Sequence, residues 1–348
     1  MINKNILITG GSGFVGINLI RFLLRQKFNS ITSLDIMDFD YPEKGLINHH
    51  NCDIRDKNVL INRLKGIDCV IHAAAALPSY KKSDIYSTDV GGTSNLLEAA
   101  SYNGVSRFVY ISTNVVYGIP DSFPIDENYE LKGKGDYALA KIESEKKCEE
   151  FRGKEMCITI LRPNVIIGPE RLGVFSIFYD WVTSKKNFPL IGMGDNIYQM
   201  LDVEDLCDAI LLSLKAENEI ANDNYNIAGE VYATMREDYQ AVMDYAGYGK
   251  RIIGFPHQPV IWIIKILEYF HISPVYSWIY ETAAIDYYVS IEKAKSKLGY
   301  EPAYSNKMAL IRNYKWYCEN NHKYDNKYGN THRDPWKQGI LQFIKIFF

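Results

Sequence analysis

The feature that most constrains the fold of this 348-residue chain is the alternation of short apolar runs with longer helical patterns in its first half. The short runs are rich in β-branched residues, and they read NILITG, ITSLDI, DCVIHAAA and RFVYIST. Segments with helical spacing of apolar residues lie between them, such as GFVGINLIRFLLRQ and GGTSNLLEAASYNG. Strands that alternate with helices form βαβ units with parallel strands. We therefore expect a doubly wound α/β sheet of at least six strands, with MCITILRPNVIIG as one further buried strand.

The first strand-to-helix turn contains three glycines in GxxGxxG spacing, Gly10, Gly13 and Gly16. In such a turn the first glycine permits a tight bend, the second lets the backbone approach a pyrophosphate, and the third lets helix and strand pack closely. The helix start at Phe14 and Val15 then offers unpaired amides to phosphate groups. This arrangement predicts a Rossmann-type dinucleotide site.

An acidic residue, Asp35, ends the next predicted strand, close to the offset of roughly 20 residues expected for a ribose-binding carboxylate. A carboxylate there accepts hydrogen bonds from both ribose hydroxyls and repels a 2'-phosphate, so we expect NAD rather than NADP. Further cofactor contacts are predicted at later strand ends. Asp53 and Ile54 lie where an adenine edge is expected, and the small side chains of Ala73, Ala74 and Ala75 let the backbone approach the cofactor closely; Pro163 is the last predicted contact.

The second half of the chain has a looser pattern. After Gly168 we expect a helix in FSIFYDWV, a loop in FPLIGMGD, a helix in VEDLCDAILLSLK and a short strand in DNYNIAG, the last two returning to the sheet. From TMREDYQ onward the chain reads as helices. We therefore predict a dinucleotide-binding domain over 1–165 with 200–228 returning to it, a smaller and mostly helical substrate part over 166–199 and 229–317, and a polar tail over 318–348.

Composition excludes several classes of function. The formal net charge is -3, so no basic surface for nucleic acid is indicated. The six cysteines form no CxxC or Cys/His cluster, so we expect neither a metal site nor a disulfide framework. The strand pattern begins too early for a signal peptide, and no apolar run reaches the ~18 to 20 residues of a membrane span. A cytoplasmic protein is expected.

The motif GDYALAK places Tyr137 four residues before Lys141 at a predicted helix start. A tyrosine has a reference pKa of about 10, so a nearby cation must favour its phenolate before it can act as a base at neutral pH. Positions i and i+4 share one face of a helix, so the Lys141 ammonium is expected beside the Tyr137 ring. Thr113, just past the strand RFVYIST, can orient a reacting oxygen.

The chain carries five motifs in order: GxxGxxG, DxxD, HxAA, a Ser/Thr before VYG, and YxxxK. From residue 5 to about 210 they resemble the signature of the extended short-chain dehydrogenase/reductase family. The resemblance implies that Tyr137 is the general acid/base, that Thr113 positions the substrate oxygen, and that Lys141 tunes the tyrosine and holds the nicotinamide ribose. It also implies a homodimer formed through the helices of GGTSNLLEAA and YALAK.

Family patterns also bear on the reaction. Dehydratases of the family carry an Asp-Glu pair after the threonine, whereas Asn114 and Val115 stand here, so dehydration is disfavoured. The remaining reaction types are those of an epimerase or an oxidoreductase. Either would act on an activated sugar that is nucleotide- or lipid-linked. Two alternatives stay open: an oxidoreductase like the 3β-hydroxysteroid dehydrogenases acting on a hydrophobic alcohol, and an NAD-binding regulatory module without activity.

The chain departs from the family pattern at several positions. Asp89 replaces the usual Asn of NVxGT, Val165 aligns with an Asn that contacts diphosphate, and Tyr198 with Gln199 replaces an Arg-Asp pair. A missing arginine matters because a guanidinium binds a diphosphate through two parallel hydrogen bonds. The predicted substrate-contacting residues are Asn114, Asn164, Val165, Arg171 and Tyr198.

The segment WKQGILQFIKIFF ends the chain. As a helix it places Ile340, Leu341, Ile344, Phe347 and Phe348 on one face. Together with the apolar helix around Trp262, this face could rest on the inner surface of a membrane. The alternative is that it packs on the protein itself or on a second subunit.

Overall fold

The computed structural model describes residues 4–153, 156–269, 280, 282–324, 328–329 and 331–348. These residues form two compact units. The first unit contains Met1–Asn164, Val203–Ala228 and Val289–Glu301, and the second contains Val165–Asp202, Gly229–Tyr288 and Pro302–Phe348. The predicted polar tail falls partly on residues 325–327 and 330, which lie outside the described residues.

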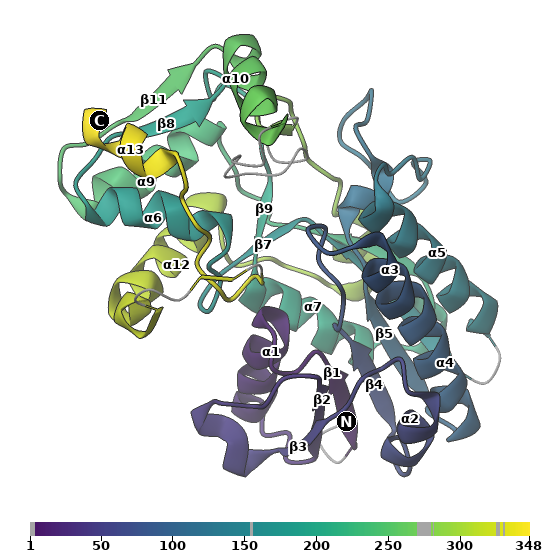
Figure 1. Cartoon of the computed structure of the whole chain (residues 1–348). Helices are drawn as coiled ribbons and strands as arrows, with labels where there is room; N and C mark the ends of the chain where they lie inside the picture. Colours follow the sequence, from purple (N-terminus) through teal and green to yellow (C-terminus); the bar gives the residue numbers. More distant parts are fainter. Residues whose placement is uncertain (1–3, 154–155, 270–279, 281, 325–327, 330) are drawn as a thin grey trace. The chain divides into compact units, whose positions relative to one another are not determined.

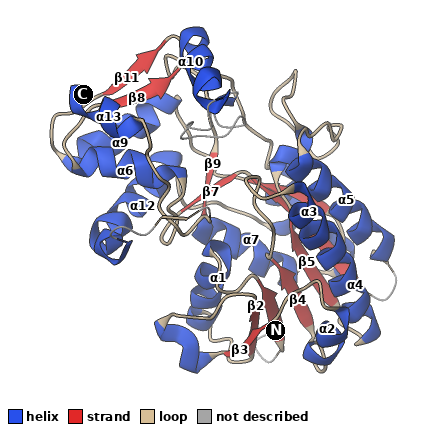
Figure 2. Ribbon diagram, viewed as in Figure 1, coloured by secondary structure: helices blue, strands red, loops and turns tan. Residues whose placement is uncertain are grey.

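The first unit is built on a seven-stranded parallel sheet with the order β10-β6-β5-β4-β1-β2-β3 (Figures 1 and 2). The strand order reverses beside β1, as in the doubly wound dinucleotide-binding folds. This confirms the Rossmann-type α/β prediction. The strands are β1 (Ile6–Thr9), β2 (Ile31–Asp35), β3 (Asn48–Asn51), β4 (Cys69–His72), β5 (Arg107–Ile111), β6 (Cys157–Pro163) and β10 (Asn224–Ile227).

Helices flank this sheet. One group comprises α2 (Lys57–Arg63), α3 (Lys82–Ile85), α4 (Thr93–Tyr102) and α5 (Asp136–Phe151), and the other contains α1 (Phe14–Arg25) and α7 (Val203–Lys215) (Figure 1). A short helix α8 (Asn218–Ala221), a π-helical segment (Tyr86–Gly92) and a 3₁₀ helix (Asn114–Tyr117) complete the unit around the sheet. The central strands are buried on both faces, which explains their continuous apolar runs.

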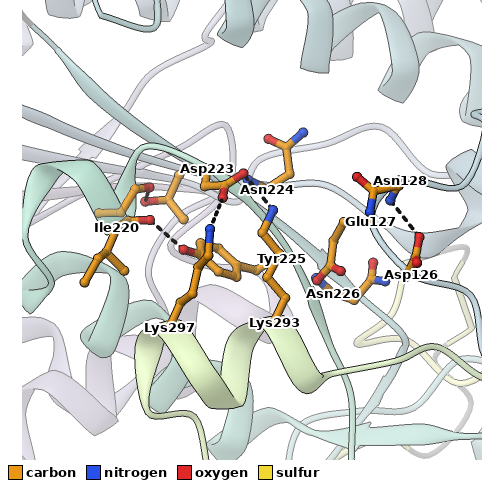
Figure 3. A network of polar contacts seen from close by, with 12 residues as sticks. Asp126, Glu127, Asn128, Ile220, Asp223, Asn224, Tyr225, Asn226, Lys293 and Lys297 are labelled. Atoms are coloured by element: carbon orange, nitrogen blue, oxygen red, sulfur yellow. Dashed lines mark hydrogen bonds and ion pairs between the residues drawn. The ribbon is translucent and has the colours of Figure 1, made fainter.

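A segment distant in sequence also belongs to the first unit. Residues Val289–Glu301 were assigned to the substrate part in our sequence-based division, yet they group with the sheet. Lys293 and Lys297 bind the carboxylate of Asp223 at 2.7 and 3.3 Å, next to strand β10 (Figure 3). A main-chain hydrogen bond of 2.8 Å from Ser290 N–H to Ile125 O anchors the start of the segment.

The second unit differs from the sequence prediction at three places. The predicted strand MCITILRPNVIIG is interrupted at Asn164, and its end forms β7 (Val165–Ile167), which pairs with β9 (Met200–Asp202). FPLI, predicted as a loop, is β8 (Phe188–Ile191), and it pairs with β11 (Ile252–Phe255) inside the region predicted as purely helical. These three predictions were wrong because short strands depend on a partner distant in sequence.

The remaining helices of this unit agree with the sequence pattern. They are α6 (Val174–Thr183), α9 (Met235–Ala246), α10 (His257–Tyr269), α12 (Asn306–Asn320) and the short α13 (Leu341–Ile344). Helices α6, α9 and α12 share an aromatic core, with Phe178, Tyr179 and Tyr314 in ring contact. Among the residues that the structure describes, no helix has both the length and the apolar character needed to cross a bilayer.

The C-terminal segment packs largely on its own unit. Phe348 makes edge contacts with Trp181 and Phe255, and Lys345 pairs with Asp180. Of the five residues predicted to share an apolar face, only Phe347 is strongly exposed, and the outward apolar side chains also include Phe343 and Ile346. Helix α13 (Leu341–Ile344) is too short to form the predicted apolar face. Most of this segment therefore packs on the protein itself, which was the alternative expectation.

Candidate functional site

The glycine turn between β1 and α1 packs so closely against its own backbone that it has no space for side chains. Gly10 has φ of +70°, and a Cβ on it would lie 2.8 Å from the backbone nitrogen of Ala74. A Cβ on Gly16 would lie 2.1 Å from Gly10 O, so only glycine lets α1 start this close to the strand. Helix α1 begins after its N-cap Gly13, which makes no side-chain cap hydrogen bond. The turn fits a dinucleotide pyrophosphate.

The carboxylate of Asp35 lies at the end of β2 beside this turn. It accepts hydrogen bonds from Ser12 N–H at 3.0 Å and from Met37 N–H at 2.9 Å, which fixes its orientation. Burial raises the pKa of Asp35, and the two amide bonds counteract that rise. Each oxygen keeps a lone pair for a ribose hydroxyl, as the proposed role requires.

The other predicted cofactor residues occupy neighbouring strand ends. Asp53 is bound by the Arg55 side chain, whose hydrogen bonds lower the pKa of that carboxyl. Ile54 is buried in the core against Gly92, so its backbone rather than its side chain is left for a ligand. Ala73, Ala74 and Ala75 follow β4, and Ala74 N–H donates to Thr9 Oγ. Pro163 ends β6 and pairs with Ile227.

Tyr137 and Lys141 lie on one face of α5, as their spacing predicts. Lys141 is 2 % exposed, and its Nζ donates to Ile111 O at 3.1 Å and to Tyr110 Oη at 3.3 Å. Its ammonium lies 6.0 Å from the centre of the Tyr137 ring. Burial lowers the pKa of Lys141, and the carboxylates of Asp89 and Glu145 counteract that effect. The half-buried Tyr137 thus has a cation next to it that the strand end holds in place.

The end of β5 positions the next two predicted residues. Thr113 caps the 3₁₀ helix Asn114–Tyr117, and its Oγ accepts from Val115 N–H at 3.3 Å. Its side chain remains half-exposed, whereas Asn114 is buried. The first unit therefore holds Thr113, Tyr137 and Lys141 around the carboxyl end of β5, where ligands bind in doubly wound sheets.

A buried polar network behind these residues was not predicted. His72 Nδ1 lies 2.7 Å from Thr9 Oγ, and its Nε2 lies 2.9 Å from Thr93 Oγ. The Thr93 hydroxyl donates to the main-chain oxygen of Asp89, and the Ser144 hydroxyl donates to the same oxygen at 2.7 Å. The network links β1, β4, the π-helical segment and α5. In the sequence, the histidine of the HxAA motif was the only sign of this network.

The residues predicted to contact substrate are divided between the units. Asn164 is in the first unit, buried, with its N–H bonded to Ile227 O at 2.9 Å. Val165, Arg171 and Tyr198 are in the second unit, where Val165 pairs with Met200, the Arg171 guanidinium lies over the Phe175 ring, and Tyr198 packs on Tyr287. Their contact with a substrate stays a prediction. Within the described part of the chain, no cluster of side chains is suited to holding a metal ion.

Together, the parallel sheet, the glycine turn and the carboxylate of Asp35 at the end of β2 have the arrangement typical of dinucleotide-binding α/β proteins. The family model described as "NAD dependent epimerase/dehydratase family" matches residues 6–228. The chain belongs to this family, and NAD is its cofactor. It is an NAD-dependent enzyme by family, which leaves the regulatory module without support.

Individual relatives agree with this assignment. The chain is 34 % identical over 347 residues to the uncharacterized protein y4nG of Sinorhizobium fredii, covering 98 % of this chain and 85 % of that one. It is 33 % identical over 224 residues to the N-acetyl-alpha-D-glucosaminyl-diphospho-ditrans,octacis-undecaprenol 4-epimerase of Escherichia coli, covering 61 % and 64 % of the two chains. The crystal structure of a Thermotoga maritima UDP-glucose 4-epimerase with UDP-glucose shares the fold, with a TM-score of 0.76, 22 % identity and coverage of 91 % and 99 %.

Proposed function

We propose that this protein is an NAD-dependent epimerase or oxidoreductase that acts on a hydroxyl or keto carbon of an activated sugar, nucleotide- or lipid-linked. The observation that carries the proposal is the pairing of the buried Lys141 ammonium with the Tyr137 ring in the unit that holds the glycine turn. The relative that acts on an undecaprenyl-diphosphate-linked sugar supports the lipid-linked form of the substrate.

In this proposal Tyr137 takes the proton of the substrate hydroxyl and later returns it to the oxygen. Lys141 makes that exchange feasible because its positive charge favours the phenolate. Thr113 donates a hydrogen bond that fixes the oxygen before Tyr137. Bound NAD would supply the hydride-accepting and hydride-returning chemistry at the same carbon. General acid/base catalysis of this kind contributes roughly 100- to 10,000-fold in rate.

The residues after Thr113 do not favour a dehydration reaction. Elimination of water needs a second acid and base near the neighbouring carbon. The positions that follow Thr113 hold Asn114, a buried amide, and Val115, and neither side chain can exchange a proton at neutral pH. We therefore propose that the substrate carbon passes through a keto form, and that no water is eliminated from the neighbouring carbon.

One experiment addresses both the cofactor and the reaction. Native mass spectrometry of the purified protein should detect NAD, and turnover of a panel of nucleotide sugars, a polyprenyl-diphosphate sugar and a 3β-hydroxysteroid should identify the substrate class. Tightly retained NAD with sugar inversion supports the epimerase, whereas exchanging NAD with net reduction supports the oxidoreductase. Tyr137→Phe should reduce turnover at least 100-fold while NAD binding is kept. Full activity of this variant would refute the proposed role of Tyr137.

A lipid-linked substrate would bring the protein to the inner membrane surface, and α10 is suited to that contact. Its outward face exposes Trp262, Ile263, Ile266 and Tyr269 around the cation of Lys265. Aromatic and aliphatic side chains with a lysine are typical of helices that lie on anionic bilayers.

Sedimentation with vesicles tests the proposed membrane contact. We expect binding to phosphatidylcholine vesicles that contain phosphatidylglycerol, and weaker binding to phosphatidylcholine alone. The double variant Trp262→Ser/Ile266→Ser should lose that binding, while Leu46→Ser, at an exposed leucine of the first unit, should keep it. Equal sedimentation of both variants would exclude α10 as the contact.

We also propose a homodimer formed through α4 and α5, where Tyr102 and Leu139 are exposed. Light scattering of the purified chain tests the proposed dimer. A mass of one chain at micromolar concentration would refute it.

A further inference from the structure

The segment around α13 directs three large apolar side chains outward. Phe343, Ile346 and Phe347 are 71 %, 69 % and 85 % exposed. They belong to α13 and to the 3₁₀ turn that follows it, Lys345–Phe347. Contact of apolar side chains with water is unfavourable, so exposed apolar residues that lie together mark an interaction surface. We call these three residues the α13 patch.

The patch is exposed although the residues next to it are packed. The Phe348 ring meets the rings of Trp181 and Phe255 edge to face, with 5.6 and 5.9 Å between the ring centres. Lys186 Nζ donates a hydrogen bond to the main-chain oxygen of Ile346 at 3.3 Å. The outward direction of the patch is therefore fixed by packed and hydrogen-bonded neighbours.

Two further segments of the second unit meet at this point. The parallel pairing of β8 with β11 is extended by a hydrogen bond of 2.9 Å from Arg251 N–H to Asn187 Oδ1. The Asn187 amide in turn donates to the main-chain oxygen of Phe348 at 3.3 Å. Figure 1 shows α13 beside these two strands, and β11 leads into α10. The patch therefore adjoins the start of α10 through β11.

The three segments that meet here are basic. Residues 181–194, 245–262 and 335–348 contain no aspartate or glutamate and two lysine or arginine residues each, in a chain whose formal net charge is -3. The six cations are Lys185, Lys186, Lys250, Arg251, Lys337 and Lys345. The neighbouring helices add two carboxylates: Asp180 of α6, which pairs with Lys345, and Asp244 of α9, which accepts a hydrogen bond from Gln240. A net positive surface therefore adjoins the apolar patch.

We propose that the α13 patch and these six cations dock the second unit on a bilayer that contains anionic phospholipids. The patch side chains enter the boundary between head groups and acyl chains, and the cations bind lipid phosphates, as in other segments that lie on membranes. Each lysine or arginine near an anionic leaflet strengthens binding about fivefold. A nucleic acid would engage the cations but offers no apolar layer for Ile346.

This docking extends the membrane contact proposed for α10. One weak signal gives only marginal and reversible binding, and stable anchoring takes two. The α13 patch is the second signal, and its cations make binding depend on the charge of the lipid. The inference rests on the proposed function for its biological purpose, because a lipid-linked substrate requires the protein at the membrane surface. The docking itself needs neither NAD nor a substrate.

Sedimentation of the full chain with vesicles tests the docking. The vesicles contain equal parts of phosphatidylcholine and phosphatidylglycerol, or phosphatidylcholine alone. Phe343→Ser/Phe347→Ser should weaken binding to the anionic vesicles at least about tenfold, since burial of each phenylalanine contributes roughly that much. Lys185→Gln/Arg251→Gln should also weaken it about tenfold or more, and should reduce the difference between the two lipids.

Matched controls come from exposed positions of the first unit. Leu46→Ser removes an exposed apolar side chain, and Lys44→Gln/Lys65→Gln removes two exposed cations, so both should bind vesicles as the wild type does. Wild-type binding by both patch variants overturns the proposal. It is also overturned if the same variants abolish binding to duplex DNA, or self-association seen by light scattering, while vesicle binding is kept. Phe347→Ser alone serves if the double variant does not fold.

Turnover of a water-soluble nucleotide sugar needs no membrane, so it separates this inference from the proposed function. If no substrate in the panel reacts but the patch variants lose the vesicles, the docking holds and the proposed function fails. If sugars react and the patch variants bind vesicles as the wild type does, the proposed function holds and the docking fails.

Discussion

At the scale of single residues, His72 shows how burial defines a protonation state. Its ring lies between Thr9 and Thr93, and burial lowers the pKa of His72 to about 3. The Thr93 hydroxyl donates to Asp89 O, so the Thr93 oxygen is free to accept from Nε2–H of a neutral ring. Thr9 then donates to Nδ1.

The neutral ring predicts a pH dependence of stability. An unfolded histidine has a pKa of about 6.5, so the unfolded chain binds a proton that the folded chain excludes between about pH 6.5 and pH 3. Stability should therefore fall as pH falls through this window, by about 1.4 kcal/mol per pH unit from this residue.

Urea unfolding at several pH values measures this slope. His72→Asn keeps an acceptor near Thr9 and should flatten the slope, at a cost in stability at neutral pH. His322→Asn, at an exposed histidine, should leave the slope as it is. A wild-type slope in His72→Asn would show that other groups cause the acid sensitivity.

At the scale of elements, α5 and β6 are joined by a buried ion pair. Arg162 Nη2 lies 2.6 Å from Glu145 Oε2, and the two side chains are 3 % and 2 % exposed. Ser112 donates to the same carboxylate, and Arg162 also donates to Tyr117 Oη at 2.9 Å. This pair fixes the helix that carries Tyr137 and Lys141 against the strand that ends at Pro163.

Breaking the pair from one side should be costly. Arg162→Met leaves the Glu145 carboxylate buried and unpaired, so we expect a loss of about 3 to 5 kcal/mol in the free energy of unfolding. Adding Glu145→Gln should restore part of that loss. Lys147→Met removes an exposed pair with Glu150 on the same helix and should cost less than about 1 kcal/mol. Similar losses for the two single variants would contradict the argument from burial.

At the scale of the whole molecule, the chain passes from the first unit to the second and back more than once. The last return, Val289–Glu301, is held at Asp223 by Lys293 and Lys297 (Figure 3). Burial opposes the charge on Asp223, yet the hydrogen bond from Lys293 and its neighbours lower the pKa of that carboxyl overall. The attachment is therefore present above the ordinary carboxylate pKa of about 4 and is lost in stronger acid.

Neutralising Asp223 should loosen this return segment before the rest of the unit. Asp223→Asn should raise amide hydrogen exchange in residues 291–299 and lower the free energy of unfolding by about 1 kcal/mol. Glu301→Gln, at an exposed acid in the same segment, should change neither quantity. Uniform protection across the segment in Asp223→Asn would show that packing alone retains it.

The sequence by itself determined the features that depend on local spacing. The glycine turn, the alternation of strands and helices, and the i, i+4 placement of Tyr137 and Lys141 each need only neighbouring residues, because backbone conformation and helix periodicity are local. The structure bears out the fold and brings these residues to one end of the sheet.

Tertiary structure alone decided the features that depend on partners far along the chain. The break at Asn164, the strands β8 and β11, and the return of Val289–Glu301 all follow from pairing between distant segments. Asp89 read as one departure from a motif, and only the structure showed that its side chain is buried, with Oδ2 lacking a hydrogen-bond donor among the described residues. Charge compensation in an interior depends on three-dimensional neighbours, and no periodicity in the sequence records them.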